Sequence, residues 1–433
     1  MQEWMSALTN HRVKVLDRKM KIIHVNYFDT IGGSGRAAYR IHHALRQAGV
    51  ESRMVVKEAA SSDWTVQVLA PKKQNANLYH RIQSKWFNTL IRRFRTGSQT
   101  LHSPDISSLV DVRQINACDA DVIHLHWFNS GMLSIADIGK IKKPIVWTLH
   151  DMWAFCGAEH VTYEFRWKEG YRKDNRPDYE GGFDLNRWTW ERKRKHWQRP
   201  MHIITPSQWL AECVRQSALM REQPVTVIPN AIDTNLWQPL EKRLARQILK
   251  LPAHVPLIIF GALGRGNDPN KGFDLLRDTL AHLRGEVAGL ELVIFGQHPP
   301  QTPPDLGFPA HYTGHLHDDI SLRLLYNAAD LLVIPSRLEN LPNTGVEAHA
   351  CGTPVVAFNI GGLPDIVEHL RTGYLAAPYD TVDLAQGIKW VLENQGAGSL
   401  GRQARARAVE RFDGLVVAQQ YIETYKQVLS NWS

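Results

Sequence analysis

The sequence predicts an α/β protein with two domains, each built on a parallel sheet covered by helices. Three observations support this class. Short apolar runs alternate with helical stretches along the chain. Each half opens with a strand, a glycine-rich loop and a helix. The 433 residues are enough for two or three domains of ordinary size.

The predicted strands form two sets, separated by a polar, turn-rich segment at residues 230–243 that we interpret as a linker. The first set lies at residues 21–26, 53–57, 121–127, 144–150, 202–206 and 225–229, and the second at 257–263, 290–296, 330–335 and 353–358. The boundaries that follow are an N-terminal extension over 1–19, expected to be disordered, a first domain over 20–232, a second domain over 233–412 and a C-terminal helix over 413–433.

Composition is typical of a globular protein of a reducing cytoplasm. Hydrophobic residues make up 43% of the chain and charged residues 22%. The four cysteines form no CxxC pair, so neither a disulfide framework nor a zinc site is indicated. The N-terminus lacks the apolar segment of a secretory signal, and no run reaches the roughly 18 apolar residues of a membrane span.

The net charge of +8 is concentrated in two segments. Residues 79–95 have the pattern of an amphipathic basic helix, which could lie on an anionic membrane or pack its apolar face on the core. Residues 187–199 interleave basic and aromatic side chains. We interpret this second segment as a solvated helix face or a wall of an acceptor site, and we expect no nucleic-acid partner.

Two glycine-rich loops are candidates for phosphate binding, because backbone amides and a helix dipole there point at an anion. The first holds Gly32, Gly33 and Gly35, but it matches neither the GxGxxG spacing nor a P-loop, so a tight turn explains it equally well. The second holds Arg265 and Lys271 after a strand. Two cations at the carboxyl edge of a sheet favour a diphosphate ligand.

The stretch "ENLPNTGVE" carries Glu339 and Glu347 after the strand at 330–335. Thr344 and Glu347 fit a capping box at the start of a short helix, and Gly352 fits the C-terminal cap. Glu339 lies in the loop after the strand, where ligands bind in open α/β sheets. Local chemistry alone does not require the two acids to form one site.

Residues 335–380 resemble the signature region of the retaining family 4 glycosyltransferases, which have the GT-B fold. That resemblance implies two Rossmann-like domains whose parallel sheets face a central cleft, and a final helix that crosses back to the first domain. Weaker matches extend it from about Lys21 to Tyr425. The matching residues are Pro335, Ser336, Glu339, Glu347, Ala350 to Val356, Gly361, Gly362, Ile366, Val367 and Gly373, with Gly32, Gly33, His150, Pro229 to Asp233, Arg265, Lys271 and Thr313 to Leu316 elsewhere.

The resemblance also implies a donor, a UDP- or GDP-linked sugar held mainly by the second domain. Glu347 would accept hydrogen bonds from the ribose, and Glu339 would hold the transferred sugar. Arg265 and Lys271 would hold the diphosphate and offset the charge that builds on the leaving nucleotide. The remaining donor-site residues would be Asn343 and Thr344, whose amides face a phosphate, Leu316, and Gly33, which would let the first domain's loop approach the phosphates.

The first domain would supply His150, which corresponds to the family histidine near the anomeric carbon. With Glu339, Arg265 and Lys271 it completes the expected catalytic set. His126 and Trp127 are the acceptor candidates. Strand alternation puts His124 and His126 on one face, and packing in the core explains both equally well.

The resemblance implies transfer with retention of configuration, through same-face attack in which the leaving phosphate takes the acceptor proton. No metal and no cofactor is then expected. The acceptor would be a glycan or a lipid-linked saccharide in bacterial surface polysaccharide synthesis, with the enzyme in the cytoplasm or peripheral on the inner membrane face. The chain departs from the family pattern at Asn340, Leu341 and Pro342, next to the donor sugar. The long polar segment 154–184 is expected to shape the acceptor site.

Two alternatives from other classes remain open. One is a nucleotide-sugar epimerase with the same fold, and the other is a non-catalytic sugar-binding or membrane-binding homologue.

Overall fold

The computed structural model describes residues 19–71, 93–98, 100–261, 268–316, 318–395 and 398–432. Arg265 and all but three residues of the predicted basic helix at 79–95 lie outside these ranges. The chain forms two compact units. Unit 1 comprises Met1–Ile204, Arg215–Thr226 and Ala418–Ser433, and unit 2 comprises Thr205–Val214 and Val227–Val417.

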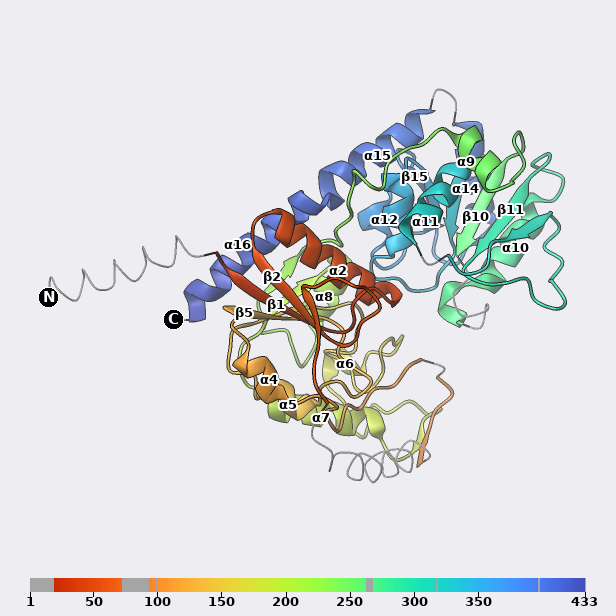
Figure 1. The fold of residues 1–433 in the computed structure, drawn as a ribbon. Helices are drawn as coiled ribbons and strands as arrows, with labels where there is room; N and C mark the ends of the chain where they lie inside the picture. The colour runs from red at the N-terminus through yellow and green to blue at the C-terminus, as the bar shows by residue number, and fades with distance from the viewer. Residues whose placement is uncertain are drawn as a thin grey trace, which may run out of the picture. The chain divides into compact units, whose positions relative to one another are not determined.

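Unit 1 contains a seven-stranded sheet in the order β3-β2-β1-β5-β6-β8-β9, whose pairs from β3 to β8 are parallel (Figure 1). All six predicted strands are present, and the short β3 was not predicted. The strands are β1 (Lys21–Phe28), β2 (Glu51–Glu58), β3 (Val66–Val68), β5 (Val122–Leu125), β6 (Ile145–Thr148), β8 (His202–Thr205) and β9 (Val225–Val227), with a separate antiparallel pair of β4 (Phe94–Arg95) and β7 (Gly181–Gly182). The helices are α2 (Gly32–Gln47), α4 (Val112–Ala117), α5 (Ile135–Ile138), α6 (Arg166–Glu169), α7 (Leu185–His196) and most of α16 (Gly414–Trp432), whose first four residues belong to unit 2. Helix α8 (Gln208–Gln216) begins in unit 2, and only Arg215 and Gln216 belong to unit 1.

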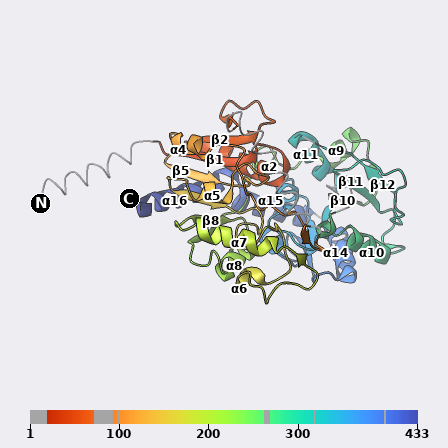
Figure 2. The same ribbon diagram turned by 90° about the horizontal axis from the view of Figure 1, so that it is seen from below.

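Unit 2 contains a six-stranded parallel sheet in the order β12-β11-β10-β13-β14-β15, whose β10, β11 and β12 lie side by side in Figure 2. The four predicted strands are present, and the short strands β12 and β15 were not predicted. The strands are β10 (Leu257–Gly261), β11 (Glu291–Phe295), β12 (Ala310–Tyr312), β13 (Leu331–Ile334), β14 (Val355–Phe358) and β15 (Gly373–Ala376). The helices are α9 (Lys242–Ile248), the 3₁₀ turn η1 (Pro269–Lys271), α10 (Phe273–Leu283), α11 (Asp319–Ala328), α12 (Asn343–Ala350), α13 (Leu363–Ile366), α14 (Thr381–Glu393) and α15 (Ser399–Phe412).

The sheet of unit 2 is buried on both faces, which explains why its strands read as continuous apolar runs. Leu257 and Ile259 of β10 belong to one core cluster, and Ile258 and Phe260 to another. Because neighbouring residues of a strand point to opposite faces, the two clusters cover the two sides of the sheet.

In both sheets the strand order reverses beside the first strand of the unit. In unit 1 the reversal lies between β1 and β5, and in unit 2 between β10 and β13. Loops that leave the two strands at such a point run in opposite directions and open a crevice at the carboxyl edge of the sheet, where ligands bind. Most of the predicted site residues follow these strands, whereas His150 follows β6 and Leu316 follows β12.

The predicted capping box of α12 is wrong. The N-cap residue is Pro342, without a side-chain cap, and Glu347 is 3% exposed. Its carboxylate accepts from the Tyr326 hydroxyl at 2.9 Å instead, because it points into unit 2. The C-terminal cap is as predicted: Gly352 has φ +75° and donates to the His349 carbonyl, as in a Schellman motif.

The C-terminal helix α16 lies against the sheet of unit 1 (Figures 1 and 2). Tyr421 and Tyr425 are fully buried there. The Tyr421 hydroxyl bonds Thr148 at 3.1 Å, and the Tyr425 hydroxyl bonds His124 Nδ1 at 2.7 Å. The last helix of the chain therefore completes the core of the first unit.

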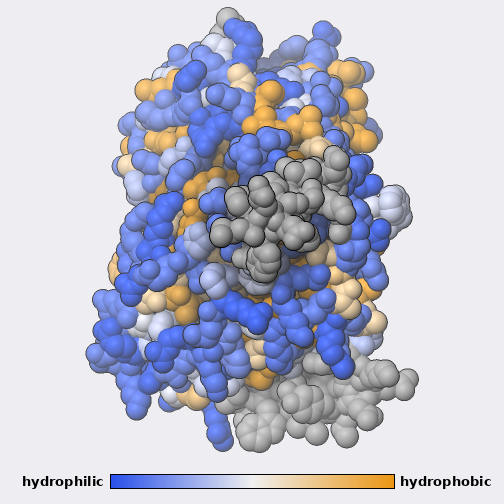
Figure 3. Space-filling model, turned by 90° about the vertical axis from the view of Figure 1, so that its left-hand side faces the viewer, coloured by the Kyte–Doolittle hydropathy of each residue, from blue (hydrophilic) through white to orange (hydrophobic). Residues whose placement is uncertain are grey.

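The face drawn in Figure 3 is mostly hydrophilic, with smaller hydrophobic areas between. Of the helices in the described ranges, none combines the length and the apolar character needed to cross a bilayer.

Candidate functional site

Lys271 and Glu339 meet at the carboxyl edge of the sheet of unit 2. Lys271 ends the turn η1 after β10, Glu339 follows the adjacent strand β13, and Lys271 Nζ lies 2.6 Å from Glu339 Oε1. The Ser336 hydroxyl donates to the same oxygen at 2.8 Å. The Glu339 carboxylate raises the pKa of Lys271, so the lysine is a cation at neutral pH. The pair places one positive and one negative group at the ligand edge of the sheet.

The two loops are held in register by backbone packing. Gly272 has φ +65°, and a Cβ there would lie 2.0 Å from the Pro335 carbonyl oxygen. The Arg337 amide donates to the Asn270 carbonyl at 2.7 Å. The segment 270–272 and the segment 335–337 therefore pack directly against each other, and a side chain at position 272 would prevent this approach.

A second glycine contact fixes Glu339 from the other side. The Gly362 amide donates to the Glu339 carbonyl at 3.0 Å, and a Cβ on Gly361 would lie 2.1 Å from that oxygen. A Cβ on Gly362 would lie 1.6 Å from the Asn340 carbonyl oxygen. The double glycine in the signature is thus required by the close approach of the 339–340 backbone.

The amino end of α12 lies next to these loops. Asn343 begins the helix, and its Oδ1 accepts from Asn230 Nδ2 at 3.1 Å. Asn230 also donates to the Leu341 carbonyl, so it anchors the segment before the helix. Thr344 is partly exposed at this end, while Glu347 lies one turn deeper. Leu316 packs against the core cluster below the sheet edge.

The structure places Lys271, Glu339, Asn343 and Thr344 at the carboxyl edge of the sheet of unit 2, after β10 and β13, and their binding roles stay predictions. Glu347 is more enclosed than a ribose-binding residue on an open loop would be. Tyr326 and Ser336 were not predicted as partners of the two acids, although Ser336 lies only three positions from Glu339. The pairing of Tyr326 with Glu347 spans 21 positions.

A cavity of about 590 Å³ lies elsewhere in unit 2. Asp330 and Pro354, which line it, precede β13 and β14. The cavity therefore lies at the amino edge of the sheet, opposite Glu339, and we assign it no role in the site.

In unit 1 the candidate residues follow β1, β5 and β6. Gly33 lies in the first turn of α2, is exposed, and has nothing within 4 Å of an added Cβ. His150 follows β6 and is partly buried. Burial lowers its pKa to about 4, so the ring is neutral at physiological pH.

The acceptor candidates differ in exposure. Trp127 is partly exposed, and its Nε1 donates to Asp151 at 3.2 Å. His126 is only 2% exposed, and its Nδ1 lies 3.2 Å from Nε2 of the partly buried His150. His124 is fully buried between Thr148 and Tyr425. Core packing, one of the two predicted explanations, accounts for both histidines.

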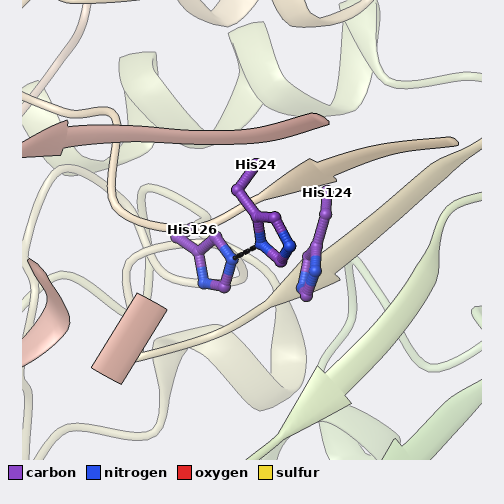
Figure 4. Close-up of side chains that lie close together, drawn as sticks. All are labelled: His24, His124 and His126. Atoms are coloured by element: carbon purple, nitrogen blue, oxygen red, sulfur yellow. Dashed lines mark hydrogen bonds between the residues drawn. The ribbon is translucent and has the colours of Figure 1, made fainter. Parts of the chain in front are cut away.

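His24 of β1 joins this group, which the sequence analysis did not anticipate (Figure 4). His24, His124 and His126 each place a ring nitrogen within 4.8 Å of the others, a spacing open to a metal ion. However, both nitrogens of His124 already have hydrogen-bond partners. The rings of His124 and His126 also lie 4.1 Å apart at 34°, which is closer to stacking than to convergence on one centre. Hydrogen bonding explains this arrangement better than metal ligation.

The basic and aromatic segment 187–199 has a solvated side, with Arg194, Lys195, Gln198 and Arg199 exposed, and also a buried side that was not predicted. On α7 and just beyond it, Trp190 and Trp197 are 8% exposed and Lys193 is fully buried. Lys193 Nζ donates to the carbonyls of Gly157 and Trp153, and lies 3.7 Å from the centre of the Trp153 ring. The spacing of 190, 193 and 197 puts all three on one helix face, a signal that the charges obscured.

Comparison with known families identifies two matching regions. The model described as Glycosyltransferase Family 4 matches residues 31–236, and the model described as Glycosyl transferases group 1 matches residues 258–394. Together they span most of the two units.

Curated relatives are glycosyltransferases. An MMP alpha-(1->4)-mannosyltransferase from Mycolicibacterium hassiacum is 29% identical over 322 residues, 72% of each chain. A D-inositol 3-phosphate glycosyltransferase from Mycobacterium bovis is 29% identical over 426 residues, 92% of this chain and 80% of the relative.

Solved structures share the fold. Sucrose-phosphate synthase from Thermosynechococcus elongatus superposes with a TM-score of 0.64 at 18% identity, over 95% of this chain and all of that one. HepE from Anabaena, solved in complex with UDP and glucose, gives 0.63 at 20% identity, over 94% and 99%. These matches confirm the predicted α/β class and the GT-B fold.

Proposed function

Because the chain belongs to the family 4 glycosyltransferases, we propose that it is a retaining enzyme that transfers a sugar from a nucleotide-diphosphate sugar to a glycan or lipid-linked acceptor in bacterial surface polysaccharide synthesis. The observation that carries the proposal is the Lys271–Glu339 pair at the point where the strand order of unit 2 reverses. A cation there suits a diphosphate, and a carboxylate beside it suits sugar hydroxyls.

On the donor side, Lys271 would move from Glu339 to the diphosphate and stabilise the charge that grows on it as the glycosidic bond breaks. Arg265 is proposed for the same role. Amides at Asn343 and Thr344, in the first turn of α12, would add donors to a phosphate. Glu347, held by Tyr326, would bind the ribose. The UDP and UDP-glucose complexes of HepE favour a uridine nucleotide as the first donor to try.

The proposed chemistry needs no separate base. The bond from the anomeric carbon to the leaving phosphate breaks, the acceptor oxygen forms its bond on the same face, and the acceptor proton passes to the phosphate oxygen. Cationic side chains take the electrostatic role that a metal fills in other transferases. In unit 1, His150 would donate a hydrogen bond to a reacting sugar, while Gly33 would admit a phosphate and Trp127 would contact the acceptor.

The acceptor proposal includes the long segment that sequence analysis singled out at 154–184. In unit 1 this segment is held by the ion pair of Arg166 with Asp184 at 2.8 Å and by the hydrogen bond from buried Lys193 to the Gly157 carbonyl at 2.7 Å. Such a fixed loop can shape a binding surface. Peripheral contact with an anionic membrane on the cytoplasmic side remains a proposal that rests on the basic sequence at 79–95.

The test is an assay with a panel of UDP- and GDP-linked sugars and glycan or lipid-linked acceptors. We expect release of nucleoside diphosphate that depends on the acceptor, and a product whose anomeric configuration, read by proton NMR, matches the donor's. Interconversion of nucleotide sugars without acceptor would instead identify an epimerase. Binding of the nucleotide without turnover across the panel would identify a non-catalytic protein.

A further inference from the structure

Three histidines of unit 1 form a continuous hydrogen-bonded chain. His24 Nδ1 lies 2.9 Å from His126 Nε2, and His126 Nδ1 lies 3.2 Å from His150 Nε2. The three come from β1, from the end of β5 and from the loop after β6. Figure 4 shows the rings of His24 and His126 facing each other. His126 therefore uses both of its ring nitrogens to link a buried histidine to one nearer the surface.

All three rings are neutral at physiological pH. His24 is fully buried, and burial lowers the pKa of His24 and His126 well below 6.5 and that of His150 to about 4. A neutral imidazole has one N–H donor and one lone pair. The hydrogen-bonded series His24–His126–His150 therefore has only two proton arrangements. Either every ring N–H donates toward His150, or every ring N–H donates toward His24.

The buried end of the chain distinguishes the two arrangements. Among the described residues, His24 Nε2 has no hydrogen-bond partner. The neighbouring ring of His124 cannot serve, because Thr148 and Tyr425 occupy its two nitrogens. If the donors pointed toward His24, Nε2 would be a buried N–H without an acceptor. If the donors point toward His150, His24 Nε2 carries a lone pair that accepts no hydrogen bond. A buried acceptor without a partner is more common in proteins than a buried donor without one.

We propose that His24 donates to His126 and His126 donates to His150, so that His150 Nε2 is an acceptor and the proton of His150 sits on Nδ1. His24 and His126 are then positioning residues. Their effect is to make His150 a hydrogen-bond donor through Nδ1 and to keep Nε2 from acting as a base. The catalytic meaning of this assignment rests on the proposed function, whereas the tautomer itself does not.

The tautomer is measurable directly. In the intact protein labelled with ¹⁵N-histidine at pH 7.5, long-range proton–nitrogen correlation distinguishes protonated from unprotonated ring nitrogens, and the His150→Gln variant identifies the His150 signals. We expect an unprotonated Nε2 and a protonated Nδ1 at His150. A protonated Nε2 at His150 would overturn the proposal whether or not the protein proves to be a transferase.

A matched pair of variants tests the positioning role. In His126→Asn the amide nitrogen can take the place of Nδ1 and still donate to His150, whereas in His126→Gln it can take only the place of Nε2. We expect His126→Asn to retain kcat within about threefold and His126→Gln to lose about tenfold or more, with KM for the donor unchanged in both. If the two variants have comparable melting temperatures, the difference in kcat does not come from a general loss of stability. A higher kcat for His126→Gln than for His126→Asn would contradict the proposed direction of donation from His24 to His150.

Metal content supplies an independent check. If His24, His124 and His126 held a metal ion, the purified protein would contain about one equivalent of metal, and His24→Ala would lose it. That result would overturn the hydrogen-bonded chain. We expect no difference in bound metal between the native protein and His24→Ala.

Discussion

Lys271 Nζ and Glu339 Oε1 lie 2.6 Å apart, although 68 positions separate the two residues in the chain. The contact joins the loops that follow β10 and β13, two adjacent strands that run parallel. In the structure described here each charge neutralises the other. A nucleotide sugar could separate them, because its diphosphate would attract the lysine and its hydroxyl groups would donate to the carboxylate.

Replacing Lys271 should impair transfer without unfolding the protein. For Lys271→Ala we expect a loss of about 100-fold or more in kcat/KM, because a cation at the leaving group acts most strongly in the transition state. The pair is part-buried, with 37% of the Lys271 side chain and 13% of the Glu339 side chain exposed, so stability should fall modestly; Ser336 still donates to the remaining carboxylate. The measurement is steady-state kinetics with the preferred donor.

Lys242→Ala is the matched control for this variant. Lys242 pairs with Asp330 at 2.6 Å in unit 2, but at the amino edge of the sheet. The Lys242→Ala variant should retain transferase activity. Equal kinetics for Lys271→Ala and Lys242→Ala would remove Lys271 from the site.

Gly362→Ala should disturb the loop that carries Glu339. The added methyl would lie 1.6 Å from the Asn340 carbonyl oxygen and 2.6 Å from Ser207 Cβ. Overpacking of this kind costs about 1–3 kcal/mol and shifts the backbone. We expect a lower urea midpoint together with lost transfer. Native stability in this variant would show that the loop can move aside.

Gly33→Ala, unlike Gly362→Ala, should leave stability unchanged and affect donor binding alone. Nothing lies within 4 Å of the added methyl, and Gly33 is not among the residues with positive φ, so stability should stay within about 0.5 kcal/mol of the parent. If a phosphate approaches this turn of α2, the methyl should weaken donor binding, which calorimetric titration with the nucleotide sugar measures. Unchanged affinity would remove Gly33 from the proposed donor site.

Acid should destabilise unit 1 through its buried histidines. Burial lowers the pKa of His42 and His150 to about 4, and of His24, His124 and His126 well below 6.5. The unfolded chain then binds more protons than the folded unit below pH 6.5, so stability is fully present above that pH and is lost as pH falls toward 4.

Each such histidine contributes a slope of about 1.4 kcal/mol per pH unit within that window. We therefore expect the urea midpoint, followed by tryptophan fluorescence, to fall steeply between pH 6.5 and 5. Most carboxylates titrate below that interval. Burial raises the pKa of Glu180 in unit 1 to about 7, so this one group opposes the five histidines, and the net slope stays steep. A midpoint that stays constant between these pH values would refute the assignment of buried neutral rings.

Local patterns predicted most of the fold and the edge at which the site lies. The apolar runs at 21–26 and 257–263 predicted β1 and β10, and the glycines after them predicted the loops. Three-residue strands such as β3 were not predicted, because so short a run shows no periodicity of apolar residues. Lys193 was misjudged for a different reason: its charge outweighed a helical spacing that placed it in the core.

The sequence by itself determined the α/β class, the two sets of strands and the identity of the charged residues after β10 and β13, because each depends on residues close together in the chain. Only the tertiary structure decided which of them meet. Glu347 changed from a helix cap to a buried partner of Tyr326, and His126 changed from an acceptor candidate to a link between His24 and His150. Such pairings depend on strand order and on side-chain direction across a sheet, which a linear pattern does not specify.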